Sequence, residues 1–196
     1  ASLVGGTLSG VVGSESITLN QSGTFANANA GSSILVTATD SISGSTAANY
    51  LLVQPSGLTG NINPKQISIS GAVANNKIYD GFSSATMSNW GTVSTGVATE
   101  TLTLNHGSAV FSDANAGTSK VVTASGYSIA DGSNGGFARN YVLASTTTTT
   151  SADINKAVLT VTANNDAKFI TQTDTAGYAG VSFSGFVNGE TSSVVT

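Results

Sequence analysis

The chain has 196 residues, of which only 8% are charged, and its 6 Lys and Arg against 10 Asp and Glu leave a net charge of -4. This balance offers no basic surface to a nucleic acid, no apolar run approaches the ~18 residues of a membrane-spanning helix, and the lack of cysteine excludes disulfides and zinc–thiolate sites. The regular placement of the apolar residues among abundant Gly, Ser, Thr and Asn predicts a folded chain rather than a disordered one.

Short strand patterns follow one another along the whole chain. Segments that alternate apolar and polar residues predict strands with one face on a core; they are 17–19, 67–69, 102–104, 159–161 and 181–183. Segments 34–36 and 50–53 are continuously apolar and predict strands that are buried on both faces or lie at a domain seam. Clusters of Gly, Asn and Asp separate these segments at turn spacing, and no window keeps a helical period. The sequence therefore predicts an all-β fold of sandwich-like domains.

The strand patterns belong to a repeat. Motifs return in the same order with a slowly growing offset: Glu-Ser-Ile-Thr-Leu-Asn at 15–20 returns as Glu-Thr-Leu-Thr-Leu-Asn at 100–105, Phe followed by Asn-Ala-Gly at 25–31 returns at 111–117, and Asn-Tyr-Leu-Leu at 49–52 returns as Asn-Tyr-Val-Leu at 140–143. Leu-Thr-Val-Thr at 159–162 and Ser-Gly-Phe-Val before Glu190 start a third copy. All three glutamates of the chain, Glu15, Glu100 and Glu190, thus occupy one repeat position.

These matches set the predicted domain boundaries. Residues 65–155 form one complete repeat, residues 1–64 form a repeat without its first ~20 residues, and residues 156–196 begin a third. We expect the chain to be a window of a longer tandem, elongated array, and we expect residues 1–64 to fold poorly alone because strands of their core are missing. A β-solenoid is the alternative, but its repeats are usually only ~20–30 residues long.

Several of these motifs resemble a known family. Lys77-Ile78-Tyr79-Asp80-Gly81 resembles the signature of YDG repeats, which also carry the Asn-Ala-Gly turn, the Asn-Tyr-Leu strand and the Ile-Asn-Pro-Lys junction seen at 62–65. Residues 157–196 are similar to the related MBG repeats, although Lys168-Phe169-Ile170 stands where a Tyr-Gly pair is usual, and the junction at 154–156 lacks the proline. Both families occur in tandem in large secreted bacterial adhesins of the filamentous-haemagglutinin type, which use two-partner secretion.

The resemblance implies a function outside the cell. It suggests structural stalk or spacer repeats of an adhesin at the bacterial cell surface, supporting cell adhesion or biofilm formation, and an outer-membrane export partner. We expect no enzyme activity, no cofactor, no nucleic-acid partner and no insertion into a membrane. The alternative is a module that binds glycan, or another polysaccharide of a matrix or host surface, through loops near Trp90 and Asp131–Gly136.

The recurring polar residues have a structural interpretation beside a functional one. Each recurring glutamate follows a turn, where a carboxylate commonly accepts backbone N–H groups, and no aspartate recurs beside it as paired-acid catalysis would need. Weak calcium binding is the alternative, with Asp113 and Asp131 as candidate ligands if the fold brings them together. The tyrosines Tyr50, Tyr141 and Tyr79 are the other structural positions of the repeat motifs.

Two further side chains, His106 and Trp90, are candidate functional residues. His106, the only histidine, stands where the first copy has Gln21, so we expect an exposed turn residue rather than a catalytic base or zinc ligand. Trp90 lies in an insertion of the second copy and is the candidate ligand contact, since a loop aromatic can stack on a sugar; packing is the alternative. For Tyr79 we expect a ring packed on the core, with Asp80-Gly81 forming the next turn.

Overall fold

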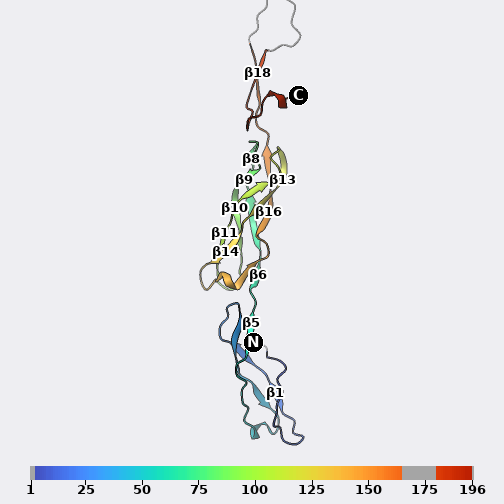
Figure 1. Cartoon of the computed structure of the whole chain (residues 1–196), viewed down its shortest axis with the longest axis vertical. Coiled ribbons are helices and arrows are strands. Elements are labelled where there is room, and N and C mark those ends of the chain that lie inside the picture. The colour runs from blue at the N-terminus through green and yellow to red at the C-terminus, as the bar shows by residue number, and fades with distance from the viewer. Residues whose placement is uncertain (1–2, 165–179, 196) are drawn as a thin grey trace, which may run out of the picture. The chain divides into compact units, whose positions relative to one another are not determined.

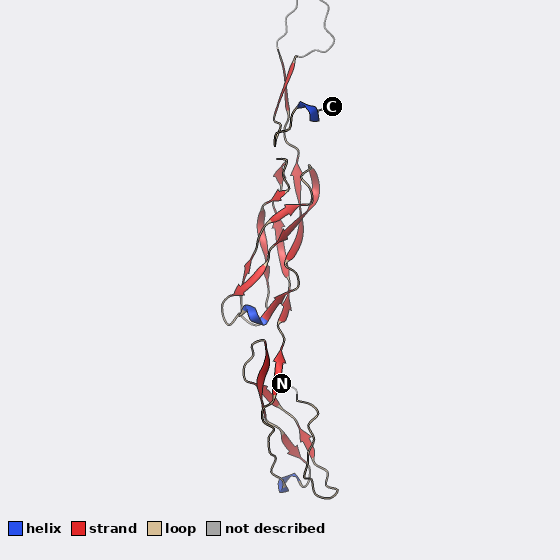
Figure 2. Ribbon diagram, in the orientation of Figure 1, coloured by secondary structure: helices blue, strands red, loops and turns tan. Residues whose placement is uncertain are grey.

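The structure of the protein is a computed structural model, which describes residues 3–164 and 180–195. The predicted all-β fold is confirmed, because strands predominate in Figure 2 and the helices of this described part are three single 3-10 turns: η1 (Ala47–Asn49), η2 (Ala138–Asn140) and η3 (Ser192–Val194). None of these helices is long and apolar enough to cross a membrane. The departure noted at Lys168-Phe169-Ile170 lies outside the described residues.

The chain forms two compact units that do not coincide with contiguous stretches of sequence. Unit 1 comprises Ala1–Ile67, Val97–Thr101 and Asp131–Val142, and unit 2 comprises Ser68–Gly96, Leu102–Ala130 and Leu143–Thr196. Two segments of the predicted second repeat therefore pack with the first repeat. The predicted repeat boundaries at 64 and 155 remain predictions.

Unit 1 is built from small antiparallel sheets. β1 (Thr18–Asn20) pairs with β4 (Ser41–Ser43), and β3 (Gly31–Ala38) lies between β2 (Gly23–Phe25) and β5 (Thr59–Ile62). β6 (Lys65–Ile67) pairs with β15 (Tyr141–Leu143), which brings the end of the second repeat to its beginning. Few side chains in this unit are buried; they are Val36, Ala38, Ile67 and Tyr141.

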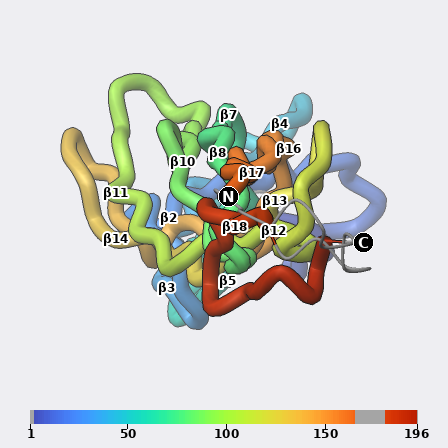
Figure 3. Tube along the Cα trace, turned by 90° about the horizontal axis from the view of Figure 1, so that it is seen from above, coloured from blue at the N-terminus to red at the C-terminus, as the bar shows by residue number. Residues whose placement is uncertain are grey.

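Unit 2 contains the larger sheet. Five strands follow the spatial order β8 (Lys77–Ile78), β16 (Thr147–Asn155), β13 (Gly117–Ser125), β12 (Ala109–Phe111) and β9 (Ser84–Ala85), and only β8 and β16 run parallel. Figure 1 labels β8, β9, β13 and β16 in one part of the chain, and Figure 3 labels β8, β12, β13 and β16 from above. Three strand pairs accompany the sheet: β7 (Ile69–Ala74) with β10 (Met87–Val93), β11 (Leu102–Asn105) with β14 (Ser128–Asp131), and β17 (Thr160–Ala163) with β18 (Val181–Ser184). The first and the third pair are antiparallel.

The main core lies in unit 2. β7 packs against β16, and alternate residues of β13 and β16 point into the space between the layers, as the period of two in a strand requires. The buried cluster is apolar and consists of Ala74, Ala109, Phe111, Val122, Ala124, Tyr127, Ala152 and Ile154. Residues 147–150, four consecutive threonines, form the first part of β16.

The two continuously apolar segments differ from expectation, one in its secondary structure and the other in its burial. Residues 50–53 form no strand, and Leu51 is 92% exposed, although the corresponding Tyr141–Leu143 is strand β15. β15 has β6 as a partner, whereas residues 50–53 have no strand partner in the described part of the chain. Segment 34–36 is a strand, but Leu35 is 52% exposed, so β3 buries only one face.

Two of the alternating segments also differ from expectation. The strand predicted at 67–69 is interrupted at Ser68, where β6 ends and β7 begins. The strand predicted at 159–161 starts at Thr160, and all of β17 is exposed, because its only partner in the described residues is the narrow strand β18. A two-stranded ribbon has no layer against which to bury a face.

The internal repeat extends to backbone details. β3 and β13 shift register at equivalent places, after Gly31 and Gly117, and each bulge contains a serine with positive φ, 52° at Ser33 and 50° at Ser119. The Ser33 N–H donates to Asn61 Oδ1 at 3.0 Å, and the Ser119 N–H donates to Asp153 Oδ1 at 2.7 Å. The same irregularity is thus held by the same kind of side chain in both copies.

Candidate functional site

Each recurring glutamate closes a tight turn. The backbone N–H of Glu15, Glu100 and Glu190 donates to the carbonyl oxygen of the valine three residues earlier, at 3.4, 3.0 and 3.0 Å. The residue after that valine has positive φ in every case: 61° at Gly13, 36° at Ala98 and 50° at Asn188. Glycine adopts this conformation freely, and asparagine adopts it more readily than other residues with a side chain. The three copies therefore build one turn from different sequences.

Each of the three recurring glutamates accepts a hydrogen bond from a tyrosine, although Tyr79 belongs to a different motif from Tyr50 and Tyr141. The Tyr50 hydroxyl donates to Glu15, the Tyr141 hydroxyl to Glu100, and the Tyr79 hydroxyl to Glu190 at 2.5 Å. We predicted that these carboxylates accept backbone N–H groups of their turns, and this prediction did not include the tyrosine hydroxyls. A hydrogen bond to a charged acceptor is stronger than one between neutral groups, so each pair ties a turn to a distant segment.

The tyrosine at each pair is held as the donor. The Val12 N–H donates to the Tyr50 hydroxyl at 3.0 Å while that hydroxyl donates to Glu15. The hydrogen bond to the Glu15 carboxylate raises the pKa of Tyr50 above its ordinary value, and the bond to Glu190 does the same for the pKa of Tyr79. Both hydroxyls stay protonated at neutral pH, which suits a structural contact rather than a catalytic base.

In unit 1, an asparagine side chain docks into an Asn-Ala-Gly turn. The Ala30 N–H donates to Asn140 Oδ1 at 2.8 Å, and Asn140 Nδ2 donates to Asn29 Oδ1 at 3.0 Å. Asn140 is the residue before Tyr141, whose ring is 7% exposed and whose hydroxyl reaches Glu100. The Asn-Tyr motif therefore uses both of its side chains to hold two other segments.

The signature segment 77–81 in unit 2 is organised by its lysine. Lys77 Nζ donates to Asp80 Oδ1 at 2.7 Å and to the carbonyl oxygens of Phe82 and Ser84 at 2.6 and 3.1 Å. The Phe82 N–H also donates to Asp80, and the hydrogen bond from Lys77 is the main reason that the pKa of Asp80 lies below its ordinary value. This network fixes the turn at Gly81, where φ is +80°.

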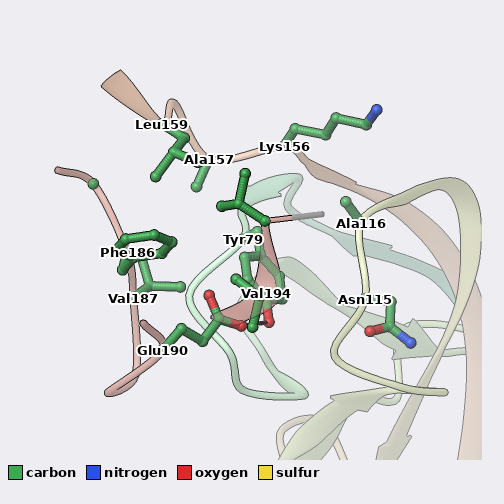
Figure 4. A pocket seen from close by; sticks show the side chains of 12 residues that line it. Tyr79, Asn115, Ala116, Lys156, Ala157, Leu159, Phe186, Val187, Glu190 and Val194 are labelled. Carbon is green, nitrogen blue, oxygen red and sulfur yellow. Dashed lines mark hydrogen bonds between the residues drawn. The ribbon is translucent and has the colours of Figure 1, made fainter. Parts of the chain in front are cut away.

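A groove of about 320 Å³ opens beside the third Tyr–Glu pair. Figure 4 shows Tyr79 and Glu190 next to each other, with apolar side chains on one side and an Asn-Ala turn on the other. We call it the Tyr79–Glu190 groove; its main lining residues are Tyr79, Asn115, Ala116, Leu159, Phe186 and Glu190.

Trp90, the candidate ligand contact, lies in strand β10 rather than in a loop. His106 is exposed and its ring stacks on the indole with centroids 3.6 Å apart and planes 7° apart. The Tyr127 ring meets Trp90 edge-on, and its hydroxyl donates to the Trp90 carbonyl oxygen at 2.8 Å. One face of Trp90 is thus covered by the histidine. In the first copy, Gln21 stands in the place of His106 and accepts a hydrogen bond from the Gly6 N–H at 3.2 Å.

The aspartates named for calcium hold turns. Asp113 pairs with Lys120 at 2.6 Å and accepts the Asn115 N–H; the lysine is the main cause of its lowered pKa. Asp131 accepts the Ala138 N–H at 2.7 Å at the end of the exposed loop 131–136. That loop also contacts the Glu100 turn, since the Ser133 N–H donates to the Thr101 hydroxyl. Within residues 3–164 and 180–195, no three His, Asp or Glu side chains gather as a metal ion would need.

Comparison with known proteins then decides the family. A family model described as the YDG domain matches residues 1–57 and residues 63–150, which together make up well over half of the chain. The chain belongs to the YDG domain family. No curated protein and no solved structure matches it. The MBG-like character of residues 157–196 remains a prediction.

Sequence reasoning identified the recurring YDG-repeat residues but missed what joins them. In the sequence, Asn140 stood out only as part of a repeated Asn-Tyr motif, and Lys77 only as the first residue of the signature segment. The sequence did contain a signal for these contacts. A tyrosine, a glutamate and an asparagine recur together in the repeat, and polar residues that recur together are candidates for hydrogen-bonded pairs. Distances between residues that lie 35 to 111 positions apart cannot be obtained from spacing.

Proposed function

We propose that this YDG-domain chain is a structural spacer in the stalk of a secreted bacterial adhesin. The observation that carries the proposal is the threefold pairing of tyrosine and glutamate, at Tyr50–Glu15, Tyr141–Glu100 and Tyr79–Glu190. Side chains that recur in a repeat are the natural candidates for a shared activity. Here they are used to hold turns against distant segments, which is what a spacer needs.

The composition and the repeat organisation support the same role. Tandem copies of one modest domain provide length at low sequence complexity, with each copy contacting its neighbours. The Asn140 carboxamide, bound between Asn29 and Ala30, links the second copy to the first inside unit 1. A chain without cysteine also suits export in an unfolded state.

The proposal places the protein outside the cell, at the bacterial surface, with an outer-membrane transporter as its export partner. Its role there is to support cell adhesion or biofilm formation by carrying a binding region away from the surface. The proposal assigns no catalytic activity and no cofactor to this chain. Direct binding of glycan or matrix polymer through Trp90 and the loop 131–136 is the competing function.

A glycan and matrix-polymer array with the purified chain separates the two functions. We expect no signal above that of the heat-denatured chain, because His106 covers one face of Trp90 and the loop 131–136 is tied to the Glu100 turn. Trp90→Ala is the diagnostic variant, and Phe82→Ala, which removes an exposed aromatic ring elsewhere in unit 2, is its matched control. Reproducible binding that is lost in the first variant and kept in the second would overturn the spacer proposal.

A further inference from the structure

The two Asn-Ala-Gly turns differ in one respect: one is covered and the other is open. In unit 1, Asn29 and Ala30 are half-buried beneath the Asn140 carboxamide, which accepts from the Ala30 N–H and donates to the Asn29 side chain. In unit 2, Asn115 and Ala116 are both exposed, and nothing in the described part of the chain accepts a hydrogen bond from the Ala116 N–H. The donor and acceptor that hold a carboxamide in unit 1 are therefore open in unit 2.

Residues 157–159 occupy the repeat position of strand β6 but have no strand beside them. β6 (Lys65–Ile67) pairs with β15, and Ile67 is only 5% exposed. The residues 92 positions later, 157–159, belong to no strand, and Leu159 is 39% exposed. A backbone segment that receives the Tyr141 strand in unit 1 thus has a counterpart in unit 2 without a strand on it.

The third equivalence is the acidic residue. Glu100 accepts the hydroxyl of Tyr141, the residue that follows the docked Asn140. Glu190 occupies the same repeat position and lines the same groove as Asn115 and Leu159. It accepts the Tyr79 hydroxyl, but a carboxylate has two oxygens with about four acceptor sites, so a second hydroxyl can be added.

We propose that the Tyr79–Glu190 groove binds an extended Asn-Tyr-aliphatic segment of another YDG repeat. The asparagine carboxamide accepts from the Ala116 N–H and donates to the Asn115 side chain, the backbone adds as a strand along 157–159, and the tyrosine hydroxyl donates to Glu190. Strand addition supplies affinity, and the two side chains supply specificity. The arrangement of Asn140-Tyr141-Val142 in unit 1 is its template. The inference goes beyond the spacer proposal and can fail while that proposal stands, since it concerns repeat-to-repeat binding and not adhesion.

The test is a titration of the whole isotope-labelled chain with a peptide of residues 137–145, Phe-Ala-Arg-Asn-Tyr-Val-Leu-Ala-Ser, followed by amide NMR shifts. We expect saturable shifts at Ala116, Leu159 and Glu190 with millimolar affinity. A peptide in which Asn140 is replaced by Ala loses both carboxamide hydrogen bonds and should bind about tenfold more weakly. The chain variant Asn115→Ala loses one of them and should weaken binding by about threefold to fivefold.

Asn105→Ala is the matched control, because it removes an exposed amide at the end of β11 in unit 2 without touching the groove, and it should leave the peptide affinity unchanged. Three results would overturn the proposal. They are the absence of shifts at the three reporter amides up to about 10 mM peptide, an equal affinity of the Asn→Ala peptide, and an equal affinity of the Asn115→Ala chain. Because Asn115 is exposed, that variant is expected to keep its fold, which its unperturbed spectrum verifies.

Discussion

The Asn-Tyr motif occurs twice in the described chain with almost the same residues and with different structures. Tyr141–Leu143 is strand β15, with its tyrosine buried, whereas the segment that begins at Tyr50 is irregular and leaves Leu51 92% exposed. The local sequence cannot account for this, since both segments are apolar and follow a 3-10 turn. The two segments differ in their partners: Tyr141–Leu143 pairs with β6, and the preceding Asn140 binds the turn at Asn29. The motif becomes a strand only where another segment satisfies its backbone groups.

A similar contrast separates the two aromatic residues that precede the Asn-Ala-Gly turns. Phe111 is 2% exposed within the main cluster of unit 2, while Phe25 is half-buried beside Val36 and Gly60. Identical residues at identical repeat positions therefore contribute to cores of different size. Four comparisons test how strongly the two units differ in stability.

The largest effect is expected from isolating residues 1–64. This fragment loses Val97–Thr101 and Asp131–Val142, which belong to unit 1, and with them the Asn140 contact to Ala30. We expect it to give collapsed, poorly dispersed amide spectra. The complete chain is the control, and sharp, dispersed peaks from the fragment would contradict the view that unit 1 depends on the second repeat.

The next comparison is between Phe111→Ala and Phe25→Ala. Truncating a buried phenylalanine typically costs about 3–5 kcal/mol, through lost burial and the cavity that remains. We expect a loss in this range for Phe111, measured as the free energy of unfolding of unit 2 by amide hydrogen exchange in β13, and a clearly smaller loss for Phe25, measured in β3. Equal losses would show that the two cores are equivalent despite their different burial.

A smaller effect is expected at the Tyr–Glu pairs. Tyr141→Phe removes a hydroxyl from a buried ring and takes a hydrogen bond from the Glu100 carboxylate, so we expect a loss of about 1–2 kcal/mol. Tyr50→Phe makes the same change in the more exposed pair and should lose less. Urea unfolding of both variants beside the unmodified chain measures the difference. A larger loss at Tyr50 than at Tyr141 would be evidence that burial does not set the strength of these pairs.

The smallest effect is a dependence on alkaline pH. The pKa values of Tyr50 and Tyr79 are raised by their hydrogen bonds to glutamate, so the folded state favours the protonated hydroxyls. Their contribution to stability is complete below the ordinary tyrosine pKa of about 10 and is lost as the pH rises through the higher folded value. We expect the urea midpoint to fall in this range, and to fall less in the double variant Tyr50→Phe, Tyr79→Phe. An unchanged pH profile in that variant would contradict the assignment.

Much of this protein was predictable because its signals are local. Alternating residues at 102–104 predict a half-buried strand through the period of two, and Asp80-Gly81 predicts a turn through glycine's freedom at positive φ. Local sequence patterns did not predict correctly which apolar side chains are buried. Leu35 and Leu51 are apolar in sequence and exposed in the structure, because whether a strand has a layer over each face depends on segments far away in the chain.

The all-β class, the order of the repeats and the set of recurring side chains follow from short-range periodicity and self-similarity, so they could be predicted from the amino acids alone. The folded chain was needed to show that Tyr50 donates to Glu15, that Tyr79 donates to Glu190, and that Asn140 binds the turn at Asn29. A hydrogen bond forms only when donor and acceptor lie about 3 Å apart. For residues separated by dozens of positions, strand pairing and packing alone bring them to that distance.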